Sequence, residues 1–112
     1  MDKEVLIRAN IDYENGKNRF AGKEALYYKY LLKFKEDKHF DDAKEAFLAK
    51  DYEKLLEETH ALKGVAGTLG LLDIYHDSAE IVNAIRKNET EKVAALFDSL
   101  CNSYARTIEI LK

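Results

Sequence analysis

One histidine in the chain has neighbours suited to chemistry on its imidazole ring. His60 is followed by Lys63 and by glycines at positions 64, 67 and 70. Neutral imidazole is a nucleophile near neutral pH, and a phosphoryl group bound to its nitrogen keeps a high transfer potential. A lysine three residues further along a helix lies beside the ring, where its ammonium group can balance the charge of a bound anion. The pair therefore predicts a phosphoryl acceptor.

The three glycines need an explanation, because each glycine inside a helix costs about 1 kcal/mol relative to alanine. Helical periodicity predicts that Gly70 ends a helix and that Leu62 faces the core. Two of the glycines then share the solvent face with the histidine, where bare backbone lets another macromolecule approach the imidazole. The residues predicted on this docking face are Leu56, Glu57, His60, Gly64 and Gly67.

The whole chain has the apolar spacing of helices, with intervals of three and four residues and no sustained alternation. The pattern predicts longer helices over about 23–36, 52–68, 71–87 and 90–111, and a shorter one over about 41–49. The stripe of the 71–87 helix includes Tyr75, which we expect in the core. An antiparallel up-down four-helix bundle buries these stripes. We therefore predict one all-α domain over 1–112, with short N-terminal helical segments before a bundle core of about 23–112.

Composition limits the possible partners. The net charge is −3 with acidic and basic residues interspersed, which argues against nucleic-acid binding. No apolar run approaches the roughly 20 residues that span a bilayer, so we expect no direct membrane contact. The single cysteine, Cys101, cannot form an intramolecular disulfide, and no secretory leader is evident. These features are typical of a cytoplasmic protein, which we expect to be a monomer.

Residues 60–70, HALKGVAGTLG, resemble the H-x-L-K-G-x-A-x-x-L-G signature of histidine-containing phosphotransfer (HPt) domains. The upstream segments IDYENG and AKDYEKLLEETH also resemble the layout of that family. The resemblance implies a four-helix bundle whose exposed His60 accepts a phosphoryl group from a receiver-domain aspartyl phosphate and passes it to another receiver. It further implies that Lys63 faces the phosphate, that Gly64 permits close docking, and that Leu56 meets the apolar surface of the receiver.

The resemblance also sets the expected partners and cofactors. Receiver domains are the expected partners, and a hybrid sensor histidine kinase is a further candidate. The chain needs no cofactor or metal of its own, because the Mg²⁺ used in transfer belongs to the receiver's acidic site. It has no phosphate-binding glycine loop, so we expect no ATP-dependent kinase activity. The glutamine that many family members carry on the next helix falls at Val82, beside Asn83.

Two other functions fit parts of the pattern. A helical docking scaffold without chemistry needs only the glycines, and His60→Gln separates it from a phosphoryl carrier. The two E-x-x-H spacings, Glu57 with His60 and Glu36 with His39, are typical of bundles that bind paired metal ions. Metal ligands must point into the core, whereas one spacing is predicted to face solvent and the other to lie in a polar connection. We expect no metal site, and ordinary structural or surface roles for His39 and His76.

Overall fold

The computed structural model describes all 112 residues and contains only helices, turns and one isolated β-bridge. The α-helices are α1 (Lys3–Arg8), α2 (Tyr13–Asn18), α3 (Glu24–Lys33), α4 (His39–Leu48), α5 (Tyr52–Leu69), α6 (Leu72–Arg86) and α7 (Val93–Leu111). Two short 3-10 helices, η1 (Phe34–Glu36) and η2 (Thr90–Lys92), precede α4 and α7. No helix combines the length and the apolarity that crossing a bilayer requires.

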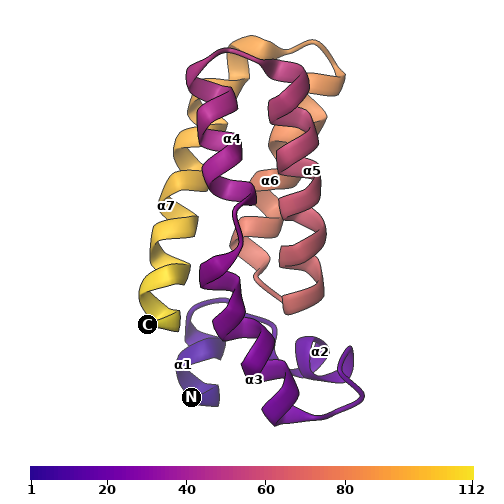
Figure 1. Ribbon diagram of the computed structural model, residues 1–112, viewed down its shortest axis with the longest axis vertical. Coiled ribbons are helices and arrows are strands. Elements are labelled where there is room, and N and C mark those ends of the chain that lie inside the picture. The colour runs from indigo at the N-terminus through magenta and orange to yellow at the C-terminus, as the bar shows by residue number, and fades with distance from the viewer.

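Four of these helices, α4 to α7, run alternately up and down to form the bundle (Figure 1). The predicted all-α antiparallel bundle with short N-terminal helices is thereby confirmed. The first helix of the bundle is not the one expected. We expected residues 23–36 there, but α4 packs along α5, and residues 23–36 lie mainly at the end of the bundle. The chain breaks between these two segments at Asp37, whose ψ of 135° is extended. The buried Tyr27 then fixes α3 at the bundle end by donating a hydrogen bond to the Leu69 carbonyl at 2.7 Å.

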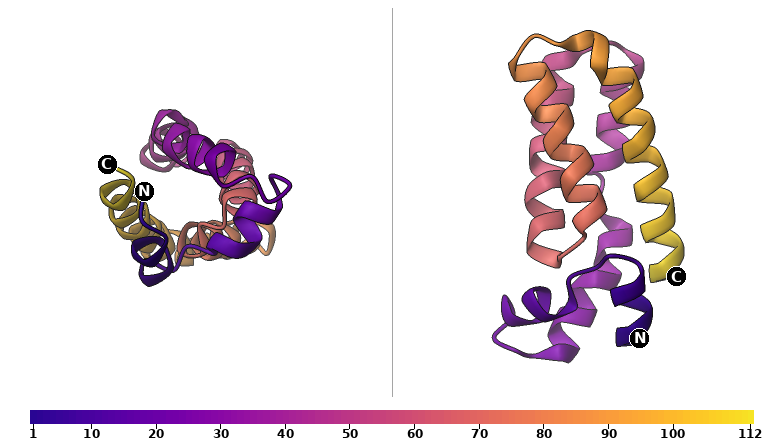
Figure 2. Two further views of the ribbon diagram at one scale, coloured as in Figure 1. Left: turned by 90° about the horizontal axis from the view of Figure 1, so that it is seen from below. Right: turned by 180° about the vertical axis from the view of Figure 1, so that it is seen from behind.

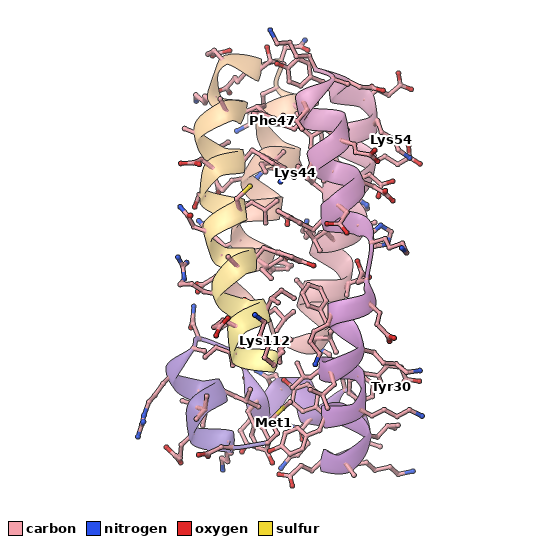
Figure 3. All side chains as sticks on the ribbon, turned by 60° about the vertical axis from the view of Figure 1, so that its left-hand side comes forward. Met1, Tyr30, Lys44, Phe47, Lys54 and Lys112 are labelled. Atoms are coloured by element: carbon pink, nitrogen blue, oxygen red, sulfur yellow. The ribbon has the colours of Figure 1, made fainter.

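Large aromatic side chains close the side of the bundle between α4 and α7. Seen along its length, the bundle has its widest backbone gap there (Figure 2, left). The ring of Phe40 stacks on Tyr104 with centroids 3.9 Å apart, and Phe47 stacks on Phe97 at 4.5 Å. Figure 3 shows side chains, Phe47 among them, filling the space between these helices. Such rings bury a large apolar area without requiring close backbones.

The N-terminal segment covers the end of the bundle where α5 turns into α6 (Figure 2, right). Leu6 and Ile11 are buried in the common core. Ile11 forms the isolated bridge with Leu71, and the Asp12 amide donates a hydrogen bond to the Gly70 carbonyl at 2.8 Å. The segment is therefore fixed to the α5–α6 turn.

The ends of α5 follow the rules expected from its sequence. The Asp51 side chain accepts a hydrogen bond from the Lys54 amide and caps the start of the helix. Gly70 ends it with φ of 77°, the left-handed conformation that favours glycine. A Cβ atom at Gly70 would also lie 2.6 Å from the Asp12 carbonyl oxygen, so the turn has no room for a side chain.

Gly70→Ala should lower the free energy of unfolding by about 1–3 kcal/mol, since it combines a strained φ with a backbone clash. Gly64→Ala is the matched control. A Cβ at Gly64 meets nothing within 4 Å. Alanine in that helix interior should raise stability by about 0.5–1 kcal/mol. Urea denaturation of both variants measures the two effects, and changes of the same sign would contradict this account of the turn.

Candidate functional site

His60 lies on the exposed face of α5, as helical periodicity predicts. Its neighbour Thr59 is fully buried, with its hydroxyl donating to the Leu55 carbonyl at 2.7 Å. Leu62, two positions after His60, is also fully buried. Because the core holds the residues on either side of it, the helix directs the His60 imidazole outward.

The imidazole borders a surface hollow of about 430 Å³, here called the His60 hollow. Its walls come from the end of α2, from α5 and from the start of α6. No aspartate or glutamate is among the lining residues, which are Arg19, His60, Lys63, Gly64, Gly67, Thr68, Leu72 and Tyr75. The hollow thus combines a histidine with two basic side chains, those of Arg19 and Lys63.

Lys63 shares the hollow with His60, as its position one turn later predicts. Its side chain is half-buried against α6, and its Nζ atom lies 5.7 Å from the centre of the Tyr75 ring. A cation over an aromatic face is attracted by the quadrupole of the ring, whose face carries partial negative charge. Tyr75 therefore holds the ammonium group on the α6 side of the site.

The two solvent-face glycines have different surroundings. Gly64 is exposed, with open space where a Cβ would be. Gly67 is half-buried, and a Cβ there would lie 3.3 Å from the Tyr75 ring. Gly67 makes room for an aromatic side chain of α6, whereas we expected bare backbone open to a partner. Tyr75 itself is 41% exposed, so its predicted place in the core is wrong.

The other predicted docking residues lie outside the His60 hollow. Leu56, half-buried, and Glu57, exposed, come one turn before His60 on α5. On α6, Val82 is 1% exposed and belongs to the interior. Its aliphatic side chain has no polar group that could form a hydrogen bond to the imidazole. Asn83 is exposed beside Val82 but forms no hydrogen bond to His60.

Sequence reasoning missed four lining residues, Arg19, Thr68, Leu72 and Tyr75. The sequence did contain a signal for Tyr75. Residues on either side of the Gly70 turn face each other across the α5–α6 pair, and a glycine such as Gly67 opposite an aromatic residue suggests that the two are in contact. No local pattern points to Arg19. Its Nη1 atom donates to the Thr68 carbonyl at 3.4 Å, across 49 positions of sequence.

The residues of the two E-x-x-H spacings do not converge. Glu36 and Glu57 are exposed, and His39 forms no hydrogen bond or ion pair with either of them. The chain contains no group of three or more His, Cys, Asp or Glu side chains arranged to hold a metal ion.

His39 instead forms an ion pair with Glu58, which sequence reasoning did not single out. The His39 Nδ1 atom lies 3.0 Å from one Glu58 carboxylate oxygen, and Lys54 Nζ lies 3.0 Å from the other. The hydrogen bond to Glu58 raises the pKa of His39. The same bond, followed by the one from Lys54, lowers the pKa of the Glu58 carboxyl. This cluster joins the start of α4 to α5 just before His60.

The sequence matches the Hpt domain family over residues 33–109. The match covers most of the chain, and the chain belongs to this family of histidine phosphotransfer domains, which interact with receiver domains in phosphorelays. No curated protein and no solved structure matched the sequence. The matched region contains His60 and Lys63, and Arg19 precedes it.

The His39–Glu58 pair predicts a stability that depends on pH in both directions. Because the pKa of His39 is raised in the folded protein, the stability that the pair gains from protonated His39 is fully present below the pKa of the unfolded state, about 6.5. That stability is lost as the pH rises through the pKa of the folded state. Because the pKa of Glu58 is lowered in the folded protein, the stability gained from ionised Glu58 is fully present above the pKa of the unfolded state. That stability is lost as the pH falls through the pKa of the folded state. His39→Gln should therefore destabilise the protein most near pH 5.5, by at most about 1 kcal/mol because solvent reaches and screens the His39 side chain, which is 39% exposed.

Chemical denaturation from about pH 3 to 9 measures this difference between the wild type and His39→Gln. His76→Gln, at an exposed histidine of α6 that forms no hydrogen bond, is the matched control. If the free energy of unfolding of His39→Gln differs from that of the wild type by the same amount at every pH in this range, the pairing is contradicted.

Proposed function

We propose that this Hpt domain carries its phosphoryl group on His60, accepting it from the aspartyl phosphate of one receiver domain and passing it to another. The observation that carries the proposal is the exposed imidazole in a hollow shared with Lys63 and the bare backbone of Gly64. The other two histidines have no such setting. His39 is paired with Glu58, and His76 lies on α6 outside the His60 hollow.

The proposed chemistry is an in-line exchange. The unprotonated ring nitrogen of His60 forms a bond to phosphorus while the bond from phosphorus to the aspartyl oxygen breaks. The bonding electrons leave with that oxygen and regenerate the receiver's carboxylate. The reverse sequence with a second receiver restores free imidazole. Since no proton abstraction by a further side chain is required, the protein's contribution is positioning and charge stabilisation.

Lys63 supplies the charge stabilisation in this proposal. A phosphoryl group in transfer spreads negative charge over its oxygens, and a nearby ammonium group offsets part of it. The contact with Tyr75 keeps Lys63 inside the hollow before the phosphoryl group arrives. Mg²⁺ is expected on the receiver, whose carboxylates and phosphate oxygens are suited to it.

The open space at Gly64 supplies access. The receiver must bring its phosphorylated aspartate to the imidazole, so side chains around His60 would obstruct the approach. Gly64 lies one turn after His60 with nothing near its missing Cβ. Leu56 and Glu57, one turn on the other side, complete the proposed contact surface on α5. We propose a cytoplasmic monomer that takes its phosphoryl group from receivers, including those of hybrid sensor kinases, and not from ATP.

His60→Gln should abolish phosphoryl transfer while the protein stays folded. Incubation with a panel of phosphorylated receiver domains, followed by detection of acid-labile, alkali-stable label on the chain, measures transfer. His76→Gln should accept label at the wild-type rate. Label on His60→Gln, or none on the wild type from any receiver, would overturn the proposal. Receiver binding that survives unchanged in His60→Gln without any transfer in the wild type would identify a docking scaffold.

Gly64→Gln should transfer at least about tenfold more slowly, because the new side chain occupies the approach to His60. Its stability should equal or exceed that of the wild type, since glutamine is the better helix former. Ala95→Gln, at an exposed alanine of α7 away from α5, is the matched control for adding this side chain. Wild-type transfer by Gly64→Gln would show that the bare backbone has no part in docking.

A further inference from the structure

The His60 hollow differs in charge from the rest of the molecule. The chain has a net charge of −3, yet the hollow is lined by Arg19 and Lys63 and by no carboxylate. Lys63 belongs to the helix of His60, whereas Arg19 comes from the N-terminal segment that precedes the matched family region. Arg19 is thus a second cation that the segment adds to the site.

The backbone around Arg19 is held firmly. Arg19 directly follows α2, which lies against the lower end of α5 (Figure 1). Gly16 of α2 is buried against Tyr27, so closely that a Cβ there would lie 2.6 Å from its ring. The next residue, Phe20, stacks on Tyr30 with centroids 5.2 Å apart. These contacts fix where the Arg19 side chain begins.

The guanidinium group, by contrast, is largely free. Arg19 is exposed, and the one hydrogen bond that its side chain makes within the chain, to the Thr68 carbonyl, is long at 3.4 Å. A guanidinium group has five N–H donors in a planar arrangement that matches carboxylates. Most of these donors are therefore available to a partner.

The position of Thr68 separates the roles of the two cations. Thr68 comes eight residues after His60 on α5, which is roughly 12 Å along the helix axis. Lys63 lies within one turn of His60 and can reach a phosphoryl group on its ring. Arg19 lies at the far end of the hollow and meets the surface that surrounds the transferring group.

We propose that Arg19 is a docking residue that binds carboxylates on the receiver surface around its acidic phosphorylation site. The inference rests on the proposed function, which brings that site onto the hollow. A receiver that holds Mg²⁺ beside an aspartyl phosphate needs further carboxylates as ligands, so its surface there is rich in negative charge. Opposite charges across an interface speed encounter and fix the register of two partners. The N-terminal segment thereby contributes to partner recognition as well as to the core.

The test compares the affinities of Arg19→Gln and Arg8→Gln for the receiver of the panel that binds the wild type most tightly. The receiver is loaded with Mg²⁺ and beryllium fluoride to mimic the aspartyl phosphate. Both variants remove one exposed arginine from the N-terminal segment, but Arg8 lies outside the His60 hollow. Arg19→Gln should raise Kd about fivefold and reduce its salt dependence, and Arg8→Gln should change Kd less than twofold. Arg19→Lys should recover part of the loss.

Equal Kd values for the two variants, or an effect of Arg19→Gln that persists unchanged in high salt, would overturn the docking role. The proposed function is judged separately, by transfer of label to His60. Binding that depends on Arg19 without transfer to His60 would overturn the relay and leave the docking role supported. Failure of every receiver to bind the wild type would overturn both.

Discussion

Gly70 joins three segments of the chain, and the arrangement around His60 depends on that junction. Its φ of 77° turns α5 directly into α6, and its carbonyl accepts the Asp12 amide. The turn sets the register of the two helices, which places Tyr75 against Gly67 and under the Lys63 ammonium group. The bond to Asp12 fixes the N-terminal segment at the same end. One residue without a side chain thus positions groups from both α2 and α6 around the imidazole.

Residues on α5 could be placed from sequence, because the direction of a side chain on one helix follows from periodicity alone. The outward direction of His60, the end of the helix at Gly70 and the bundle architecture were predicted in this way. Tyr75 was assigned to the core because it lies at the edge of an apolar stripe, where a small rotation of α6 decides exposure. Arg19 could not be predicted, since its place depends on a contact between segments far apart in sequence.

The first bundle helix shows a second limit of periodicity. Residues 23–36 have an apolar stripe, and the stripe is buried, but against the N-terminal segment as well as the bundle. α4 takes the bundle position because Phe40 and Phe47 reach across to α7. A stripe shows which face of a helix is buried, whereas the partner that covers it depends on side-chain size and on where the chain bends at Asp37.

The bridge between Ile11 and Leu71 has a consequence for the order in which the chain folds. Contacts between neighbouring helices close short loops, whereas this bridge requires the N-terminus to meet a turn more than half a chain away. Closing a longer loop costs more conformational entropy before its contacts stabilise it. We therefore expect the α5–α6 hairpin, with His60 and Lys63 already in place, to form early. The strand-like contact that brings Arg19 to them is then a late step, so the histidine site is assembled in two stages.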